Sequence, residues 1–553
     1  LGVIGDSQLK GNYVEKLHGH PLALRVLASA VKRGCHGDLA QFKGEQILAA
    51  GDKDRLSQKL EHLLGFYERQ LKNGQKELLG IISLFKRPVE IKSFVTLLGN
   101  MKSLENTPLA KANAAEIEKQ LNLLIDDFLV EKTRDGITTH PVIREYFRAG
   151  HKISGSRHEV ADFLKARPGA ERPKNIEEVR DLVEAVQLLC DEGEFNMADN
   201  LVSRLCGSYE FNIFRDLPAV AEGLELELAF VGDDARIEKV EKILRKRNVS
   251  PHYSRISIYN RILGNLPKAL EWRNKSLEIM RQLLDKEYQA VDLFEISLIE
   301  VAMGNIRQAG ETVSQALNLS LQTRDSRDLQ REFSFKAYYE FLLGNSSQAY
   351  QYFEIALHYS QKGKLSEQHL YALEGNQQAE FFIRLQALEN FEAVNAWNIQ
   401  ECRKHQWNDK IALCHLLQGW YEICRKQLPD AENVLAQAER ILRLSGIVEY
   451  TCRLDWVWAL LAEAKGEYRK GLRRVNNALL ICVDKGLRLR HADLLVLRGR
   501  LHLLQFQKEN REDKDVLEKS GDDGHEALKI AEQTEYVWAK VEALELLVAY
   551  HQT

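Results

Sequence analysis

The most regular pattern of hydrophobic and polar positions in this chain is a repeat in its second half. Gly264, Gly304 and Gly344 lie 40 residues apart, each precedes an asparagine, and an alanine follows each asparagine by four residues. The same register places a small residue beside a leucine seven positions after each alanine, and another small residue twelve positions before it. Further copies recur between residues 375 and 479. This spacing predicts pairs of antiparallel helices that repeat along the chain.

Small side chains at these positions have a physical role in helix packing. Two helices joined by a tight turn approach within about 8–10 Å only where their facing side chains are small. A glycine at the end of the first helix adopts the left-handed C-cap conformation at little cost. The pattern is that of the tetratricopeptide repeat, with a period longer than the usual ~34 residues. Past Gly499 the register slips, and we expect a lengthened polar loop over 508–524 and a capping helix over 534–550.

The first quarter of the chain has a different pattern, of amphipathic helices followed by a short hairpin. Asp135-Gly136 is a strong signal for a tight turn between two strands. Three helices followed by a two-stranded wing predict a winged-helix domain. The expected helices cover residues 11–33, 56–73, 77–85, 89–98 and 114–128, and the expected strands cover 130–133 and 137–139.

Together these patterns predict an all-α protein with a small β-wing. The low proline content, 10 residues in 553, agrees with a helical chain. We expect four parts. They are a helical domain over 1–55, a winged-helix domain over 56–150, a helical linker over 151–250, and a tetratricopeptide-repeat superhelix with a terminal capping helix over 251–553.

Composition and charge argue against several classes of function. A net charge of −4 gives no overall field that would attract nucleic acid or a membrane. The third predicted helix, 114–128, carries several carboxylates and one lysine, so we do not expect DNA binding through this chain. No apolar stretch approaches the ~20 residues of a membrane span, and no secretory signal is visible. The 8 scattered cysteines indicate buried free thiols in a reducing cytoplasm.

The sequence contains no complete active site. His18 and His20 do not predict a metal site, because alternate residues on a helix point apart and no cysteine or carboxylate cluster accompanies them. A glycine-rich loop ending in Gly-Lys-Ser/Thr, which would hold nucleotide phosphates, is missing, as is a Gly-x-Ser-x-Gly elbow. The chain opens on Leu1 inside a helical pattern, so we expect it to be the C-terminal part of a larger protein.

Two short motifs resemble those of a known class. Residues 19–24 read Gly-His-Pro-Leu-Ala-Leu and resemble the Gly-x-Pro motif of the signal-transducing nucleotide-switch ATPases (the STAND class, which includes NLR proteins). Residues 139–147 read Thr-His-Pro-Val-Ile-Arg-Glu-Tyr-Phe and resemble the winged-helix histidine motif of its bacterial members. Segments 208–223, 370–375 and 486–493 are also similar to bacterial NLR-like proteins with C-terminal tetratricopeptide repeats. By this resemblance the chain follows an NB-ARC or NACHT-type nucleotide-binding domain.

The resemblance implies roles for two residues. Pro21 would pack on the adenine side of a bound nucleotide, and His140 would donate a hydrogen bond to the β-phosphate of ADP and hold the inactive state closed. ADP or ATP with magnesium would be bound mainly by a domain absent from this chain. The chain has Pro141 where the better-known eukaryotic members have aspartate. From the residues alone, Pro21 also fits the first position of a helix and His140 a helix-capping or packing role, and these alternatives stay open.

A third candidate site is a basic cluster in the repeats. Arg488, Arg490 and His491 begin a predicted repeat helix, where positive charge opposes the helix dipole. The cluster therefore either contacts a partner or belongs to an ion-paired helix start.

The resemblance implies a sensor and regulatory function. The repeats would bind a protein or peptide trigger, for example a phage protein. They would thereby control ADP/ATP-dependent homo-oligomerisation and activation of an N-terminal effector, in antiphage immunity. Two alternatives remain. One is a tetratricopeptide-containing transcription regulator of the same class, and the other is a passive protein-interaction scaffold.

Overall fold

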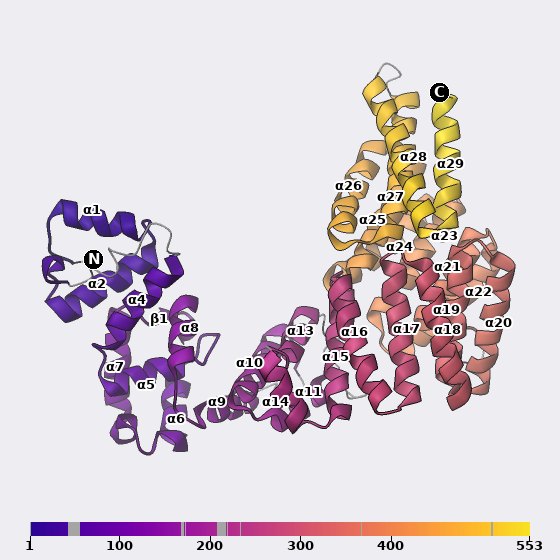
Figure 1. Ribbon diagram of the computed structural model, residues 1–553. Coiled ribbons are helices and arrows are strands. Elements are labelled where there is room, and N and C mark those ends of the chain that lie inside the picture. The colour runs from indigo at the N-terminus through magenta and orange to yellow at the C-terminus, as the bar shows by residue number, and fades with distance from the viewer. Residues whose placement is uncertain are drawn as a thin grey trace. The chain divides into compact units, whose positions relative to one another are not determined.

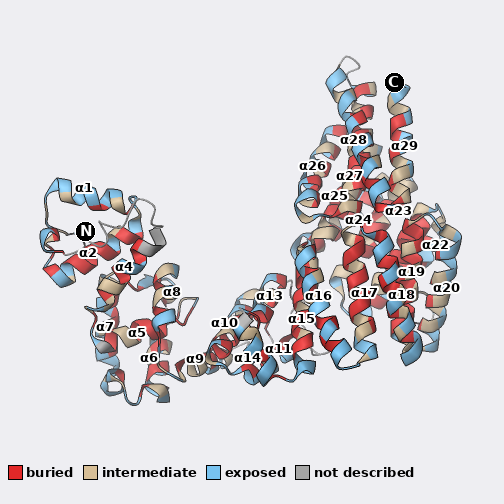
Figure 2. Cartoon of the chain, in the orientation of Figure 1, coloured by how far each residue is buried: buried red, intermediate tan, exposed pale blue. Residues whose placement is uncertain are grey.

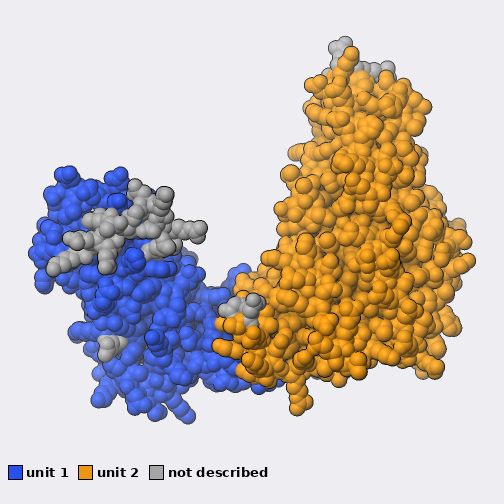
Figure 3. Space-filling model, in the orientation of Figure 1, with its two compact units in different colours: residues 1–201 blue, residues 202–553 orange. Residues whose placement is uncertain are grey.

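The chain is built from α-helices in two compact units. The computed structural model describes residues 2–42, 56–167, 171, 173–206, 217, 219–232, 234–366, 368–509 and 513–553. The units are residues 1–201 and 202–553, and each is considered on its own (Figure 3). Among the described residues there is one sheet, of two short strands (Figure 1). The predicted all-α class is confirmed. The predicted boundaries at 55, 150 and 250 stay predictions.

The first unit opens with two helices where the sequence pattern predicts one. α1 spans Ser7–Lys16 and α2 spans Pro21–Cys35. Between them His18 and Gly19 have positive φ, 51° and 65°. Pro21 has no N–H with which to continue the hydrogen bonds of α1. The prediction of a single helix over 11–33 is therefore wrong, because the chain turns before the proline and starts a new helix there.

The next elements follow the predicted order of helices and hairpin. Their bounds are α4 Leu56–Glu68, α5 Asn73–Ile82, α6 Ile91–Asn100, α7 Ala114–Asp126, β1 Glu131–Thr133, β2 Gly136–Thr138 and α8 Pro141–Gly150. The strands pair antiparallel, with Lys132 opposite Ile137. Gly136 has φ 136°, and a Cβ there would lie 2.2 Å from the carbonyl oxygen of Val89, so this turn requires glycine. The assignment of these elements to the winged-helix class stays a prediction.

Further helices follow along the chain, on either side of the boundary between the two units. They are α9 Ser156–Lys165, α10 Ile176–Glu192, α11 Phe195–Cys206, α13 Val220–Leu228 and α14 Asp234–Ile243. α9 packs along α10. Within the segment 208–223, whose sequence resembles NLR-like proteins, residues 208–216 and 218 lie outside the described residues.

The second unit is a stack of antiparallel helix pairs. The pairs are α15 Lys246–Ile262 with α16 Leu266–Gln282, α17 Lys286–Ala302 with α18 Ile306–Thr323, α19 Ser326–Leu342 with α20 Ser346–Lys362, α21 Ala372–Arg384 with α22 Leu388–Lys404, α23 Asn408–Cys424 with α24 Leu428–Ser445, α25 Val448–Lys465 with α26 Tyr468–Lys485, and α27 Arg488–Lys508 with α28 Lys514–Thr534. α29 Val537–His551 ends the stack. Buried residues run along the helices throughout this unit (Figure 2). The architecture is the predicted tetratricopeptide-type superhelix.

The small residues of the repeat lie where the two helices of a pair meet. Ala269, Ala309 and Ala349 each have 0% of their surface exposed. Gly264, Gly304 and Gly344 have φ of 76°, 82° and 82°, which is the left-handed conformation that the pattern predicts at the end of each first helix.

The predicted loop over 508–524 is wrong for most of its length, and its residues 510–512 lie outside the described residues. Residues 514–524 form the first turns of α28. Most of their charged side chains are exposed, but Asp523 is 4% exposed and accepts a hydrogen bond of 2.9 Å from Arg498 of α27. Gly521 is also buried, and a Cβ there would lie 2.8 Å from the Tyr550 ring of α29. The polar composition therefore reflects an exposed helix face together with one buried ion pair, which a hydropathy pattern cannot distinguish from a loop.

The second unit curves until its first pairs meet its last ones. α17 contacts α27 directly, although the two helices lie far apart in the sequence. The turns at Gly264, Gly304 and Gly344 face the C-terminal helices, because a Cβ at each would come within 2.9, 2.8 and 2.9 Å of another side chain there. The residues they meet are Lys485, Thr534 with Arg488, and Val537, respectively. We call these contacts the seam.

Candidate ligand-binding cavity

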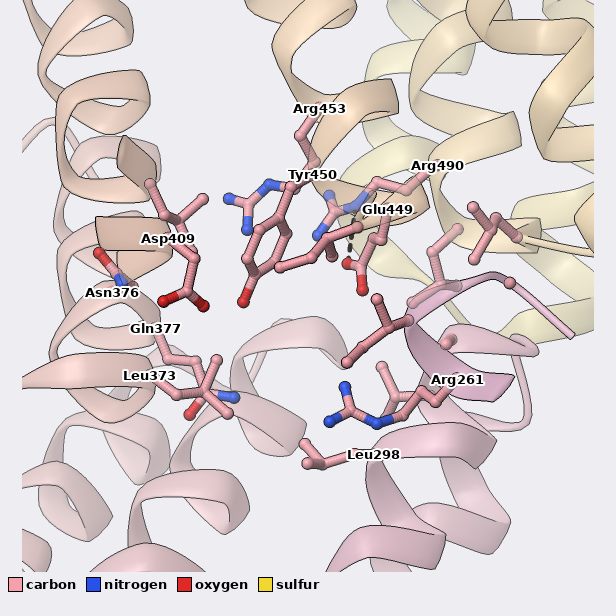
Figure 4. Close-up of a pocket in the computed structure, with 18 of the residues that line it drawn as sticks. Arg261, Leu298, Leu373, Asn376, Gln377, Asp409, Glu449, Tyr450, Arg453 and Arg490 are labelled. Carbon is pink, nitrogen blue, oxygen red and sulfur yellow. Dashed lines mark ion pairs between the residues drawn. The ribbon is translucent and has the colours of Figure 1, made fainter. Parts of the chain in front are cut away.

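The superhelix of the second unit encloses a cavity of about 160 Å³ (Figure 4). Its lining comes from the first helix of every pair, that is α15, α17, α19, α21, α23, α25 and α27, with few contributions from the second helices. The first helices thus form the inner wall of the superhelix. α17 also contacts α27, so helices from early and late pairs meet directly in this wall.

One part of the wall is apolar. Leu298, Val301 and Ala302 of α17 line it together with Phe335 of α19 and Leu413 of α23. Phe335 and Leu413 are 1% and 0% exposed and belong to the continuous core of the unit. This surface suits an aliphatic or aromatic group of a ligand.

The remaining wall is charged and forms ion pairs between helices. Arg453 of α25 donates to Glu380 of α21 at 2.8 Å. Arg490 of α27 lies 3.5 Å from Glu449, which points into the cavity (Figure 4). Burial alone would raise the pKa of Glu380, but Arg453, Arg490 and Arg384 outweigh it and hold that pKa below its ordinary value. Glu380 is therefore held in its ionised form, and its pair with Arg453 fixes two opposite charges in the wall.

A second charged group lies across the cavity on α23. Lys410 is 3.1 Å from Asp409 and donates to the hydroxyl of Tyr450 at 3.2 Å. About a quarter of the Lys410 and Asp409 side chains, 25% and 24%, stays accessible to solvent. Both residues line the cavity, so a ligand there would contact them.

The charged wall continues to a buried arginine behind it. Arg490 also pairs with Asp493 at 3.1 Å, and Asp493 lies 3.4 Å from Arg384 of α21. The Arg384 side chain is 4% exposed and is ion-paired with Glu542 of α29. Three indole rings surround its guanidinium, with centroids 5.1, 5.5 and 5.9 Å away; they belong to Trp420, Trp456 and Trp538. Trp538 also donates to the carbonyl oxygen of Phe341 at 2.7 Å. Arg384 therefore connects the cavity wall to the last helix.

The structure places the three residues of the predicted basic cluster in different surroundings. Arg490 lines the cavity and is ion-paired, so the ion-paired alternative holds for it without excluding contact with a ligand. Arg488 lies at the seam, where it is bonded to Gln533 of α28. His491 is half-buried, and burial lowers its pKa. A role in binding a partner stays a prediction for all three.

Sequence reasoning did not find the other charged residues of the cavity. Each stands within an amphipathic helix of ordinary composition; they are Arg261, Glu380, Asp409, Lys410, Glu449 and Arg453. One signal was available: they all fall on the first helix of a repeat pair, which in a curved stack forms the inner wall.

Pro21 and His140 both begin helices in the first unit. Pro21 is exposed at the first position of α2. His140 is the N-cap of α8, and its Nδ1 accepts a hydrogen bond of 3.4 Å from the backbone N–H of Val142. His20 caps α2 in the same way, with Ala23 as donor at 3.4 Å. The helix-start and helix-capping alternatives therefore describe the geometry of both residues, and their contact with a nucleotide stays a prediction.

The first unit has a separate cavity beside α8. Its lining includes Glu68, Glu145 and Tyr146, and neither Pro21 nor His140 contributes to it. In the part of the chain that the structure describes, no three His, Cys, Asp or Glu side chains are grouped as metal ligands. No helix of the described residues has the length and apolar character needed to cross a bilayer.

Comparison with known proteins gives structural likeness only. No protein-family model and no curated protein matches the chain. Among solved structures it is similar to a STAND protein with a tetratricopeptide repeat sensor from Pyrococcus horikoshii, at 15% identity and a TM-score of 0.39, covering 97% of this chain and 65% of that one. It is also similar to a Rap protein complexed with competence and sporulation factor, at 12% identity and a TM-score of 0.30, covering 68% and 98%.

A third similar structure is the APC/C hetero-tetramer Cut9-Hcn1, at 14% identity and a TM-score of 0.37, covering 92% of both chains. This chain spans 65% of the length of the Pyrococcus protein. At these scores the likenesses do not decide the function, and the fold assignment rests on the helix pairs of the chain itself.

Proposed function

We propose that the repeats of the second unit are a sensor that binds a protein or peptide trigger in the enclosed cavity. The observation that carries this proposal is the convergence of the first helices of all the pairs on one cavity with both apolar and charged walls. A superhelix that served only as a spacer would need no charged groups on its inner wall, where each costs desolvation. A peptide offers both apolar side chains and polar backbone groups, and it matches such a lining.

The sensor proposal is tested with peptides of no fixed sequence. The chain is incubated with a random pentapeptide pool, passed through a size-exclusion column, and the retained peptides are identified by mass spectrometry. We expect retention of a subset enriched in particular residues at one or more positions. Retention of no peptide, or of the unselected pool, would contradict a peptide sensor.

We further propose that this sensor regulates a nucleotide switch of the STAND class. The first unit, including a winged-helix domain, would close over ADP held with magnesium by an NB-ARC-type domain. Trigger binding would favour exchange for ATP, homo-oligomerisation and activation of an N-terminal effector, in defence against phage. A trigger that moves such an equilibrium from 1:99 to 99:1 must prefer the open state by about 10⁴-fold, or ~5.5 kcal/mol. One surface ion pair is too weak to supply such a preference.

The geometry of His140 is compatible with donation to a phosphate. Because Nδ1 accepts from the backbone of α8, the neutral ring carries its hydrogen on Nε2. That N–H is the group that would donate to the β-phosphate, and the N-terminus of α8 adds the favourable end of the helix dipole. Pro21 at the start of α2 would contribute apolar contact to the adenine.

The role of His140 is tested on the full-length parent protein. We expect His140→Ala to reduce the ADP that co-purifies with it and to raise its resting activity. Asn113→Ala is the matched control, because Asn113 caps α7 of the same unit by accepting from Glu116 at 2.9 Å. Loss of a cap costs about 1 kcal/mol in either variant. Equal ADP content in the two variants would remove His140 from the nucleotide site.

A further inference from the structure

One edge of the second unit carries exposed apolar side chains among basic ones. It lies at the ends of α15, α16, α17 and α18 that point away from the seam (Figure 1). Its residues belong to three segments, 242–248, 281–288 and 321–327, which together we call the basic edge. The segments contain 8 basic and 3 acidic side chains, so their net charge is +5, against −4 for the whole chain. All 8 basic side chains are exposed, and the edge therefore has a local positive field that the overall composition does not show.

Side-chain contacts connect the three segments into one surface. Lys246 at the start of α15 donates to Gln282 at the end of α16 at 2.7 Å. Lys286 at the start of α17 donates to Gln322 at the end of α18 at 2.9 Å. In both contacts a neutral amide accepts from the ammonium group, so the positive charge of each lysine is not cancelled by its partner.

Leu284 has an unusual place on the basic edge. It is 82% exposed, the most of any large hydrophobic side chain in the part of the chain that the structure describes. It directly follows α16 with φ 55°, a left-handed conformation that is unfavourable for leucine. The residues with positive φ that directly follow other helices of the stack are glycine or polar, for example Gly304, Arg324 and Gln386. A leucine here favours neither the turn nor the core, which points to a contact with a partner.

Other side chains add apolar surface to the same edge. Ile243, Tyr288 and Leu321 are 46%, 49% and 47% exposed. Arg247 lies 6.0 Å from the centroid of the Tyr288 ring, so cationic and apolar groups alternate on this surface. These residues line neither of the two cavities described above, and the edge is therefore separate from the proposed trigger site.

We propose that the basic edge binds an anionic lipid surface, with Leu284 inserted at the boundary of the acyl chains and Lys246 and Lys286 close to the lipid headgroups. A bilayer interface stabilises this combination, because apolar side chains enter the acyl boundary while lysine and arginine attract anionic headgroups. Tyr288, with an apolar ring and a polar hydroxyl, suits the level of the headgroups. A fluid bilayer accommodates separate apolar side chains, whereas an acidic protein would need a surface of matching shape. This inference does not depend on the peptide sensor.

The test is co-sedimentation of the full chain with lipid vesicles. One set is phosphatidylcholine alone, and the other also contains about 30% phosphatidylserine, both at about 50 mM salt. We expect binding to the anionic vesicles that is at least about tenfold tighter than binding to the neutral ones. Salt at about 500 mM should release most of the bound protein, because it screens the surface potential. Absence of binding to the anionic vesicles, or equal binding to both sets, overturns the proposal.

Leu284→Asn tests the inserted side chain separately from the fold. Asparagine adopts positive φ more readily than leucine, so the variant should have an equal or higher thermal unfolding midpoint. Its binding to the anionic vesicles should nevertheless be about tenfold weaker, because several buried methyl and methylene groups are lost. Leu480→Gln is the control, since Leu480 is 73% exposed on α26, outside the edge, and this variant should bind like the wild type. Unchanged binding by Leu284→Asn overturns the insertion of Leu284.

A double variant, Lys246→Gln with Lys286→Gln, tests the charge. Loss of two cations next to the headgroups should weaken binding to the anionic vesicles by about tenfold or more. The control is Lys470→Gln with Lys529→Gln, which changes the net charge equally at lysines that are 63% and 62% exposed on α26 and α28. This control should bind like the wild type. Equal weakening in the two double variants would show a general effect of net charge and would overturn the assignment of the basic edge.

Discussion

Arg384 is the residue whose replacement tests most sharply how the superhelix is held closed. Arg384→Met keeps the aliphatic stem and removes the guanidinium from between three indole rings and two carboxylates. The charge-assisted bond to Glu542 is worth ~1.5–3 kcal/mol, and the contact with the rings adds ~1–2 kcal/mol. In the variant, Asp493 still pairs with Arg490 at 3.1 Å. Glu542 is 26% exposed, so hydration of its carboxylate replaces part of the lost ion-pair energy. We therefore expect Arg384→Met to destabilise the closed structure by about 3 kcal/mol, which is the lower end of the range for breaking a buried ion pair.

The cost should appear as local opening of the last helix. Amide hydrogen exchange followed by mass spectrometry reports the opening of α29 separately from the rest of the chain. A loss of about 3 kcal/mol corresponds to exchange roughly 10²-fold faster in α29, with α15 and α16 unchanged. Arg307→Met is the matched control, since Arg307 pairs with Glu535 at the same end of the unit but is 73% exposed. Exchange in α29 that is equal in the two variants would refute the role given to Arg384.

Two further predictions concern the seam and a buried carboxyl. Gly304→Ala and Gly486→Ala both place alanine at positive φ, 82° and 67°, which costs about 1 kcal/mol. Only at Gly304 would the new Cβ also meet neighbouring side chains, at 2.8 Å. The thermal unfolding midpoint of Gly304→Ala should therefore be lower than that of Gly486→Ala. Equal midpoints for the two variants would argue against the contacts of the seam. Burial raises the pKa of Glu332 to about 8, so folding favours its protonated form and its ionisation destabilises the fold as pH rises. The thermal unfolding midpoint of Glu332→Gln should therefore equal that of the wild type near pH 5 and exceed it at pH 8–9. A difference in midpoint that stays constant from pH 5 to pH 9 would contradict the raised pKa of Glu332.

The repeat architecture could be predicted from the sequence because its determinants are local. A glycine that caps a helix and alanines that let two helices approach appear at fixed spacing, as at Gly304 and Ala309. The hairpin at Asp135-Gly136 could be predicted for the same reason. The error over 508–524 arose because the exposed charged face of α28, together with the buried pair of Asp523 and Arg498, gives the polar composition of a loop. The single helix predicted through Pro21 failed because hydrophobic spacing continued across a proline that starts a new helix.

The cavity could be predicted only in part, because it depends on how far the superhelix curves. The repeat register identifies the first helices as one wall, but not the closure that brings α17 to α27. Arg261 and Asn376 are far apart in the sequence, and each is unremarkable within its own helix. Arg490 was found by its unfavourable position near a helix start, and its ion pairs explain how that charge is accommodated.

The central claim is that a peptide binds inside the closed superhelix, and site-specific photo-crosslinking tests it directly. A photoreactive phenylalanine replaces Gln377, which lines the cavity, and in a second protein it replaces Leu480, which is 73% exposed on α26 and outside the lining. After irradiation with the random pentapeptide pool, we expect peptide adducts at position 377 and none above background at position 480. Equal labelling at both positions, or labelling at position 480 alone, would contradict binding within the superhelix.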